Sequence, residues 1–172
     1  PFVDQRFSEK SLKYSSRLLP LDVGHIITIV AKPLEDAECF NLFFGSDLTV
    51  DDEFDDIQFH IAVNFHKNCI VRNSYSKYEG WALPEIKENM APGNIPNPIK
   101  RGTIFKIEIF IDADMFHVSI DNKPFCIFKH RKPIKDLQRI IVFGDIDRIY
   151  QISHMTPKEL SKIANDETLV NI

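Results

Sequence analysis

Short runs of alternating apolar and polar residues, separated by turn signals, occupy most of this 172-residue chain. The clearest run is 57–65, where every second residue is apolar and polar residues such as His60 and Asn64 lie between. Because successive side chains of a strand point to opposite faces of a sheet, this pattern predicts a half-buried strand with an open polar face. Many such strands at regular spacing predict a β-sandwich or a barrel.

Further strands are expected along the whole chain, and they are bounded by glycine, proline and acidic residues. They are predicted at 12–19, 25–31, 39–44, 69–74, 80–83, 103–111, 116–120, 125–128, 137–143 and 146–153. Between two of them, Asp121–Asn122 tolerates positive φ, which predicts a tight hairpin. The segment 47–56 is acidic and is expected to be a solvated loop.

One helix is predicted near the end of the chain. Thr156 and Pro157 supply a cap and a proline at the first helical position, and Glu159 completes a capping box. Leu160, Ile163 and Ala164 follow at helical spacing. We therefore predict a short helix over 156–165.

Composition excludes several classes of function. The formal net charge of −4 gives no broad basic field for nucleic acid. No apolar run reaches the length of a bilayer span, so membrane insertion is not expected. Cys39, Cys69 and Cys126 form no CxxC pair. Two of the three lie in apolar strand runs, so they are interpreted as small buried hydrophobic residues, with one disulfide plus a free thiol left open as the alternative.

The only tryptophan, Trp81, suggests a binding surface. It follows Gly80, which predicts exposure, and it comes after strands that carry His60, Asn64 and Asn73. An indole beside imidazole and amide groups suits a sugar, whose apolar C–H face lies on the ring while its hydroxyls bind the polar groups. The alternative is that Trp81 is a core residue and His60 a satisfied strand histidine, because large aromatic side chains are buried on average.

Several segments in the right order resemble a galectin carbohydrate-recognition domain. They are 116–131, which follows the family's hairpin pattern, together with 143–146, 98–105 and 21–24. The resemblance covers residues 19–154. It implies an all-β, concanavalin-like antiparallel β-sandwich of two sheets, with residues 1–18 as an N-terminal extension or edge strand. Residues 155–172 would form a C-terminal helical tail.

The sugar motif of the family is only partly kept. Galectins carry His-x-Asn-x-Arg on one strand, Asn at the end of the next, and Trp-x-x-Glu-x-Arg on a third. The matching carbohydrate-binding residues here are His60, Asn64, Asn73, Trp81, Glu85 and Lys87. Ala62 stands where the family has asparagine and Asn64 where it has arginine, and the Trp–Glu spacing is one residue longer.

These departures shape the functional expectation. The resemblance implies a module that recognises galactose-containing glycans, with weakened or altered specificity because a short neutral amide replaces a rigid guanidinium fork. The alternative is a galectin-related protein-interaction domain that does not bind simple β-galactosides. No catalytic constellation, metal or cofactor is expected. The expected partners are glycans or glycoproteins, or another protein, and oligomer formation is left open. No signal peptide is recognised, and the family implies a cytoplasmic location or secretion by a non-classical route.

Overall fold

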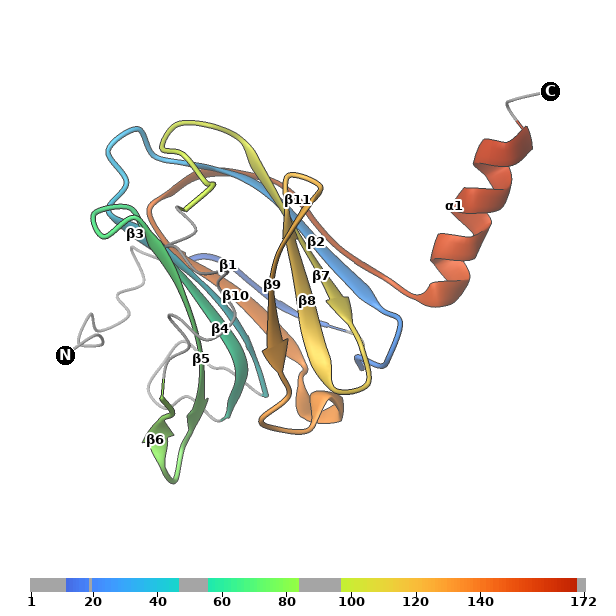
Figure 1. Ribbon diagram of the computed structural model, residues 1–172, viewed down its shortest axis with the longest axis horizontal. Coiled ribbons are helices and arrows are strands. Elements are labelled where there is room, and N and C mark those ends of the chain that lie inside the picture. The colour runs from blue at the N-terminus through green and yellow to red at the C-terminus, as the bar shows by residue number, and fades with distance from the viewer. Residues whose placement is uncertain (1–11, 19, 47–55, 84–96, 170–172) are drawn as a thin grey trace.

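Two antiparallel sheets stacked face to face form the body of the molecule in a computed structural model that describes residues 12–18, 20–46, 56–83 and 97–169 (Figure 1). The six-stranded sheet has, in spatial order, β1 (Leu12–Arg17), β10 (Arg139–Gly144), β3 (Cys39–Gly45), β4 (Ile57–Asn64), β5 (Cys69–Ser76) and β6 (Gly80–Trp81). The five-stranded sheet has β11 (Ile146–Met155), β2 (Ile26–Pro33), β7 (Phe105–Ile111), β8 (Met115–Ile120) and β9 (Lys123–Lys129). The expected two-sheet β-sandwich is confirmed.

The space between the sheets is filled by aromatic and branched side chains. Phe59 of β4 stacks on Phe116 of β8 and on Phe128 of β9, with ring centroids 4.8 and 4.7 Å apart. Phe40 of β3 stacks on Phe105 of β7 at 5.2 Å. These contacts join one sheet to the other, and burial of this apolar area is the main force that holds the layers together.

After a 3-10 turn (Ile134–Asp136) and β10, the chain passes directly to β11 of the other sheet at Gly144–Asp145. Gly144 has a φ of +105°, and a Cβ there would lie 2.8 Å from the Cys39 carbonyl oxygen. Asp145 Oδ2 accepts hydrogen bonds from the backbone N–H groups of Glu38 and Cys39, at 2.8 and 3.0 Å. Only glycine fits this approach, so the Gly–Asp pair is a structural requirement of the corner.

One charged side chain is sealed between the sheets. Arg72 of β5 is 2% exposed, and its Nη1 donates a hydrogen bond across the interior to the carbonyl oxygen of Ile127 in β9, at 3.0 Å. A buried guanidinium is tolerated only when its donors are satisfied, and this bond joins opposite sheets.

A second apolar cluster lies on the outer face of the six-stranded sheet. It consists of buried Phe43, Ile57, Ile141 and Phe143, with Leu12, Tyr75 and Trp81 packed against them. The pairing of β4 with β5 is irregular between Ile57 and His60, so Ile57 lies in this outer cluster instead of sharing a face with Phe59. The expected open polar face is also wrong at this end of β4, because Gln58 and His60 are only 2% and 7% exposed.

The C-terminal helix α1 (Pro157–Leu169) begins at the predicted capping box. Thr156 N–H donates to Glu159 Oε2 at 2.7 Å, and Glu159 N–H donates to Thr156 Oγ1 at 3.3 Å. The helix ends four residues later than predicted and extends away from the sandwich (Figure 1). No helix within the described segments is long and apolar enough to cross a membrane.

The cysteines differ from the expectation in their degree of burial. Cys39, Cys69 and Cys126 form no disulfide, and all are half-buried rather than fully enclosed. Burial raises the pKa of the Cys39 and Cys69 thiols, which keeps both groups protonated at neutral pH.

The hairpin between β8 and β9 offers a direct test of turn chemistry. Asp121 and Asn122 have φ values of 49° and 64°, as the predicted tight turn requires. We expect Asn122→Ala to lower the free energy of unfolding by about 1 kcal/mol, because a Cβ without a local polar partner is disfavoured at positive φ. Asn122→Gly should match or exceed the parent. Urea unfolding measures both variants, with Lys123→Ala as the surface control; equal stability of the alanine and glycine variants would contradict the argument.

Candidate functional site

Four of the residues predicted to bind sugar, His60, Asn64, Asn73 and Trp81, are described by the structure and lie on strands of the six-stranded sheet. His60 of β4 is paired in register with Phe43 on one side and with Asn73 on the other. Trp81 of β6 pairs with Tyr75, and its ring centroid lies 4.9 Å from that of His60 at an interplanar angle of 50°. The indole therefore lies outside the two layers, half-buried against the outer cluster, and is neither fully exposed nor part of the interior core.

His60 is held firmly by its neighbours. Its Nε2 lies 2.9 Å from Asn41 Oδ1, and its ring stacks on Phe43 at 4.6 Å with an interplanar angle of 4°. Burial lowers the pKa of His60 to about 3, so the imidazole is neutral at physiological pH. With Asn41 Oδ1 as the acceptor, Nε2 carries the proton. Nδ1 is buried and has no hydrogen-bond partner among the described residues.

Asn73 uses both ends of its amide within the protein. Its Nδ2 donates to the carbonyl oxygen of Ala82 at 3.0 Å, and its Oδ1 accepts from the backbone N–H of Ser74 at 2.9 Å. The first of these bonds ties β5 to the residue that follows Trp81. Asn73 therefore positions the indole of Trp81, and this role does not depend on any contact between Asn73 and a ligand.

Arg131, which the sugar motif does not include, reinforces the same edge. From the segment after β9, its Nη1 donates to Asn73 Oδ1 at 3.2 Å and to the Leu83 carbonyl oxygen at 3.0 Å. Next to it, Lys132 forms an ion pair with Asp56, with Nζ and Oδ2 3.0 Å apart.

Asn64 and Ala62 lie farther along the same face. Asn64 Oδ1 accepts a hydrogen bond from the backbone N–H of Lys67 at 2.7 Å, so this oxygen stabilises the turn between β4 and β5. Ala62 lies in register between Asn41 and Val71, where its methyl group offers no polar contact. The remaining predicted residues, Glu85 and Lys87, lie outside the described part of the chain.

Asn41 is a further candidate that the sugar motif does not contain. It stands in the apolar run 39–44, where Phe40, Leu42 and Phe44 belong to the interior core. The alternation of that run was the signal that could have found it, because Asn41 falls on the opposite, outer face. It is half-buried beside His60 and Ala62.

The chemistry available on this face is that of a neutral recognition surface. An indole, an uncharged imidazole and the amides of Asn41, Asn64 and Asn73 can stack on a ring and exchange neutral hydrogen bonds. Within the described segments, no group of three or more metal-ligating side chains lies together. The surface therefore suits a polar, uncharged ligand with an apolar ring face.

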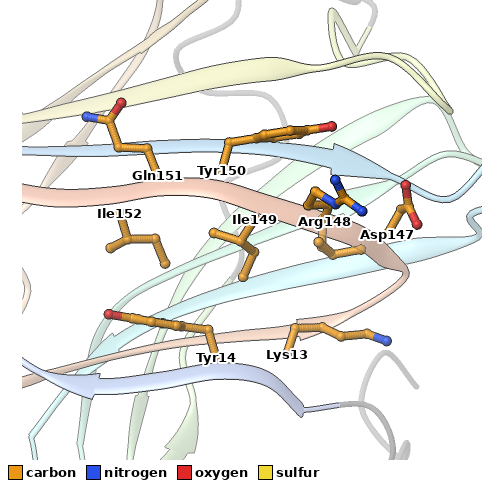
Figure 2. Close-up of a pocket in the computed structure, with 9 residues that line it drawn as sticks. Lys13, Tyr14, Asp147, Arg148, Ile149, Tyr150, Gln151 and Ile152 are labelled. Carbon is orange, nitrogen blue, oxygen red and sulfur yellow. The ribbon is translucent and has the colours of Figure 1, made fainter.

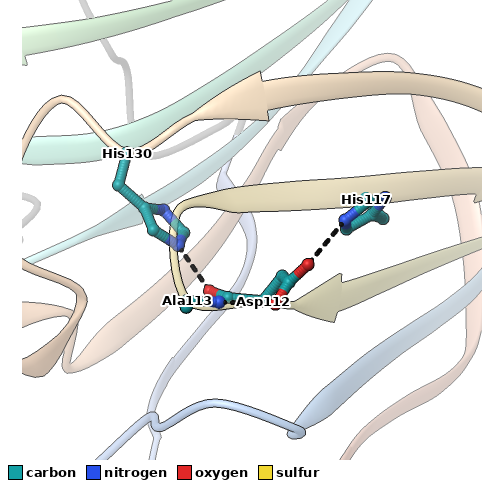
Figure 3. A network of polar contacts seen from close by, with 4 residues as sticks. All are labelled: Asp112, Ala113, His117 and His130. Atoms are coloured by element: carbon teal, nitrogen blue, oxygen red, sulfur yellow. Dashed lines mark hydrogen bonds and ion pairs between the residues drawn. The ribbon is translucent and has the colours of Figure 1, made fainter.

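A separate polar network, on the other sheet, has a structural role. Asp112 Oδ2 lies 3.2 Å from His117 Nε2, and the Asp112 carbonyl oxygen accepts a hydrogen bond from His130 Nε2 at 2.8 Å (Figure 3). His130 also meets the edge of Phe116 at 4.4 Å. These contacts join the turn after β7 to the end of β9, so His130 has a packing and hydrogen-bonding role.

Solved galectin structures share this fold. The structure resembles the Caenorhabditis elegans galectin LEC-6 with a TM-score of 0.70, at 16% identity, covering 89% of this chain and 99% of that one. It resembles sheep galectin-11, solved in complex with glycerol, with a TM-score of 0.69, at 21% identity, covering 83% and 96%. These likenesses show the fold.

Sequence relatives carry the family assignment further. A 32 kDa beta-galactoside-binding lectin of Caenorhabditis elegans is 29% identical over 72% of this chain, and galectin-8 of Rattus norvegicus is 27% identical over 74%. The chain spans about 40% of the length of these relatives. The family model described as galactoside-binding lectin matches residues 13–154. This chain therefore belongs to the galectin family of galactoside-binding lectins, which are binding proteins rather than enzymes.

Proposed function

We propose that this chain is a galectin-type carbohydrate-binding module that recognises galactose-containing glycans, with weakened or altered specificity for simple β-galactosides. The observation that carries the proposal is the position of Trp81. Its indole lies on the outer face of the sandwich, 4.9 Å from the His60 ring, where a sugar can lie on it. Glycans or glycoproteins are the partners that such a surface would bind.

The altered specificity follows from the residues at positions 62 and 64. A charge-assisted hydrogen bond contributes about 1.5–3 kcal/mol and a neutral one about 1 kcal/mol. Replacing the family's arginine by Asn64 therefore weakens galactose binding by roughly tenfold or more. The Asn64 oxygen is also already bound to Lys67 N–H, and Ala62 removes another polar contact.

A second candidate function is protein interaction through a galectin scaffold that does not bind simple β-galactosides. The state of His60 favours it, because Nε2 is bonded to Asn41 and Nδ1 is buried. Asn73 likewise has both ends of its amide hydrogen-bonded within the protein. The two candidates differ in whether any glycan binds saturably at Trp81.

Truncation of the indole tests the carbohydrate proposal. Trp81→Ala should abolish saturable binding on a glycan array, because the stacking surface is lost. Phe110→Ala is the matched control, since it removes a 39% exposed aromatic ring from the other sheet. Circular dichroism of both variants checks that they fold. Equal glycan-array binding by the parent and Trp81→Ala would contradict the carbohydrate proposal. If the parent binds no glycan on the array, the protein-interaction function is favoured.

Restoring the family motif tests the account of specificity. The double variant Ala62→Asn with Asn64→Arg should gain at least about tenfold in affinity for lactose, because the guanidinium fork forms charge-assisted hydrogen bonds to hydroxyl groups. Isothermal titration with lactose measures the gain. The control is Ala62→Asn with Asn64→Gln, which lengthens the side chain without adding charge. A gain of the same size in this control would show that charge is not the missing element.

The protonation of His60 predicts a pH dependence of stability. Because its pKa in the folded chain is about 3, below the ordinary 6.5, the unfolded chain takes up a proton first as pH falls. This contribution to stability is complete above pH 6.5 and is lost between 6.5 and about 3. The loss of this contribution between pH 7 and pH 5 should lower the free energy of unfolding by roughly 2 kcal/mol.

His60→Gln isolates this contribution, because glutamine keeps an amide donor near Asn41 and does not titrate. Urea unfolding at pH 7 and pH 5 should show a smaller loss for the variant than for the parent. Asp56, Asp112, His154 and Glu159 titrate in both proteins, so the difference between the two losses is the quantity to compare. Equal losses would show that His60 accepts a proton in the folded chain.

A further inference from the structure

A hollow of about 490 Å³ lies between the free edges of the two sheets, on the side of the sandwich away from Trp81. One wall is β1, the edge of the six-stranded sheet opposite β6, and the other is β11, an edge of the five-stranded sheet. Figure 2 shows Ile149 and Ile152 pointing from β11 toward β1, with Tyr14 on the facing strand. We call this hollow the edge groove; its lining is Lys13, Tyr14 and residues 146–152.

The floor of the edge groove is apolar because β11 is irregular. Its pairing with β2 shifts between Ile146 and Arg148, and again between Ile149 and Gln151. These two irregularities place Ile146, Ile149 and Ile152, three residues apart, all against the interior core. A regular strand would send every second residue inward, and bulges of this kind re-aim side chains near sites. The intervening polar residues are left at the rim.

The rim of the edge groove carries two cationic side chains and one carboxylate. Lys13, Asp147 and Arg148 gather at one end of the edge groove (Figure 2). Asp147 is paired with Lys32, at 3.6 Å, on the neighbouring strand β2. Neither Lys13 nor Arg148 has an ion-pair partner among the residues that the structure describes, and both are exposed. Two cationic side chains thus lie beside the apolar surface of the edge groove.

We propose that the edge groove binds a small organic anion that carries a ring. The ring would lie on Tyr14, Ile149 and Ile152, and a carboxylate or sulfate group would bind Arg148 and Lys13. The volume is that of sites for small ligands, which combine an apolar lining with a few placed polar groups. A guanidinium binds planar or tetrahedral oxyanions through two donors. This site is distinct from the proposed glycan surface and does not depend on it.

Three aromatic probes separate the contributions of ring and charge. They are 4-nitrophenyl β-D-glucuronide, which carries a carboxylate, 4-nitrophenyl sulfate, and neutral 4-nitrophenyl β-D-glucoside. Titration into ¹⁵N-labelled protein at low salt should give saturable shifts at residues 13–14 and 146–152 with at least one of the anions. The neutral glucoside should bind at least about tenfold more weakly. The ratio of the two anion affinities identifies the preferred head group.

Matched variants test the assignment to residues. Arg148→Gln should weaken anion binding by about tenfold, and Lys13→Gln should weaken it to a smaller extent. Lys123→Gln, an equal loss of charge at the opposite edge strand β9, should change affinity by less than twofold. Trp81→Ala should leave anion binding unchanged, so this result is independent of the glycan proposal.

Three results would overturn the edge-groove site. The first is that neither anion binds saturably or that the glucoside binds as well as they do. The second is an equal effect of Arg148→Gln and Lys123→Gln, which would indicate only a response to net charge. The third is a set of shifts centred on Trp81.

Discussion

The corner at Gly144–Asp145 is the shortest connection between strands of the two sheets. At this corner a strand of one sheet becomes, within two residues, a strand of the other. The Asp145 carboxylate binds the N–H groups of Glu38 and Cys39 at the start of β3, so the same residue fixes β10, β11 and β3. The register of the outer face begins here, because Cys39 is paired with Asn64, and the later pairs bring Phe43 beside His60. The residue pairs near Trp81 therefore share one β3–β4 register with the pair at this corner.

The glycan surface is built on an apolar cluster, and this explains its neutral character. Phe43, Ile141 and Phe143 are buried on the outer face, and His60 lies flat on Phe43. A charged imidazole in that position would lose its hydration without gaining a counter-ion, so the folded chain keeps it neutral. The same surroundings hold the Trp81 ring against its neighbours. The cluster makes the surface rigid, but it leaves few polar atoms free to meet a ligand.

The sequence predicted the fold well, because the fold depends on local patterns. Alternation along 57–65 and 103–111 indicated half-buried strands, the pair Asp121–Asn122 indicated the hairpin, and Thr156 with Glu159 indicated the helix start. Each signal acts within a few residues and agrees with the global arrangement. The burial of Gln58 and His60 could not be foreseen from such signals, because it depends on an irregular pairing between β4 and β5.

The site was predicted less completely than the fold. The proximity of Trp81 and His60 follows from strand order, which the family resemblance supplied. Arg131 was missed because its contact with Asn73 joins residues 58 positions apart, and no local pattern encodes such a contact. Asn41 was missed for a different reason, since it stands among phenylalanines in a run that reads as core. The edge groove depends on two register shifts in β11, whose only sequence signal is the spacing of three residues between Ile146, Ile149 and Ile152.

The sealed guanidinium of Arg72 has a mechanical consequence. The apolar core between the sheets opposes their separation. It opposes sliding of one sheet over the other much less, because hydrophobic contacts are non-directional. The 3.0 Å bond from Arg72 to the Ile127 carbonyl oxygen is directional and specific to one alignment. Arg72 directly precedes Asn73 on β5, and Asn73 positions Trp81. Sliding of one sheet over the other would therefore strain β5 next to Asn73. The bond therefore fixes the alignment of the two sheets. Through it, the outer face of the six-stranded sheet is held in place by a contact with the five-stranded sheet.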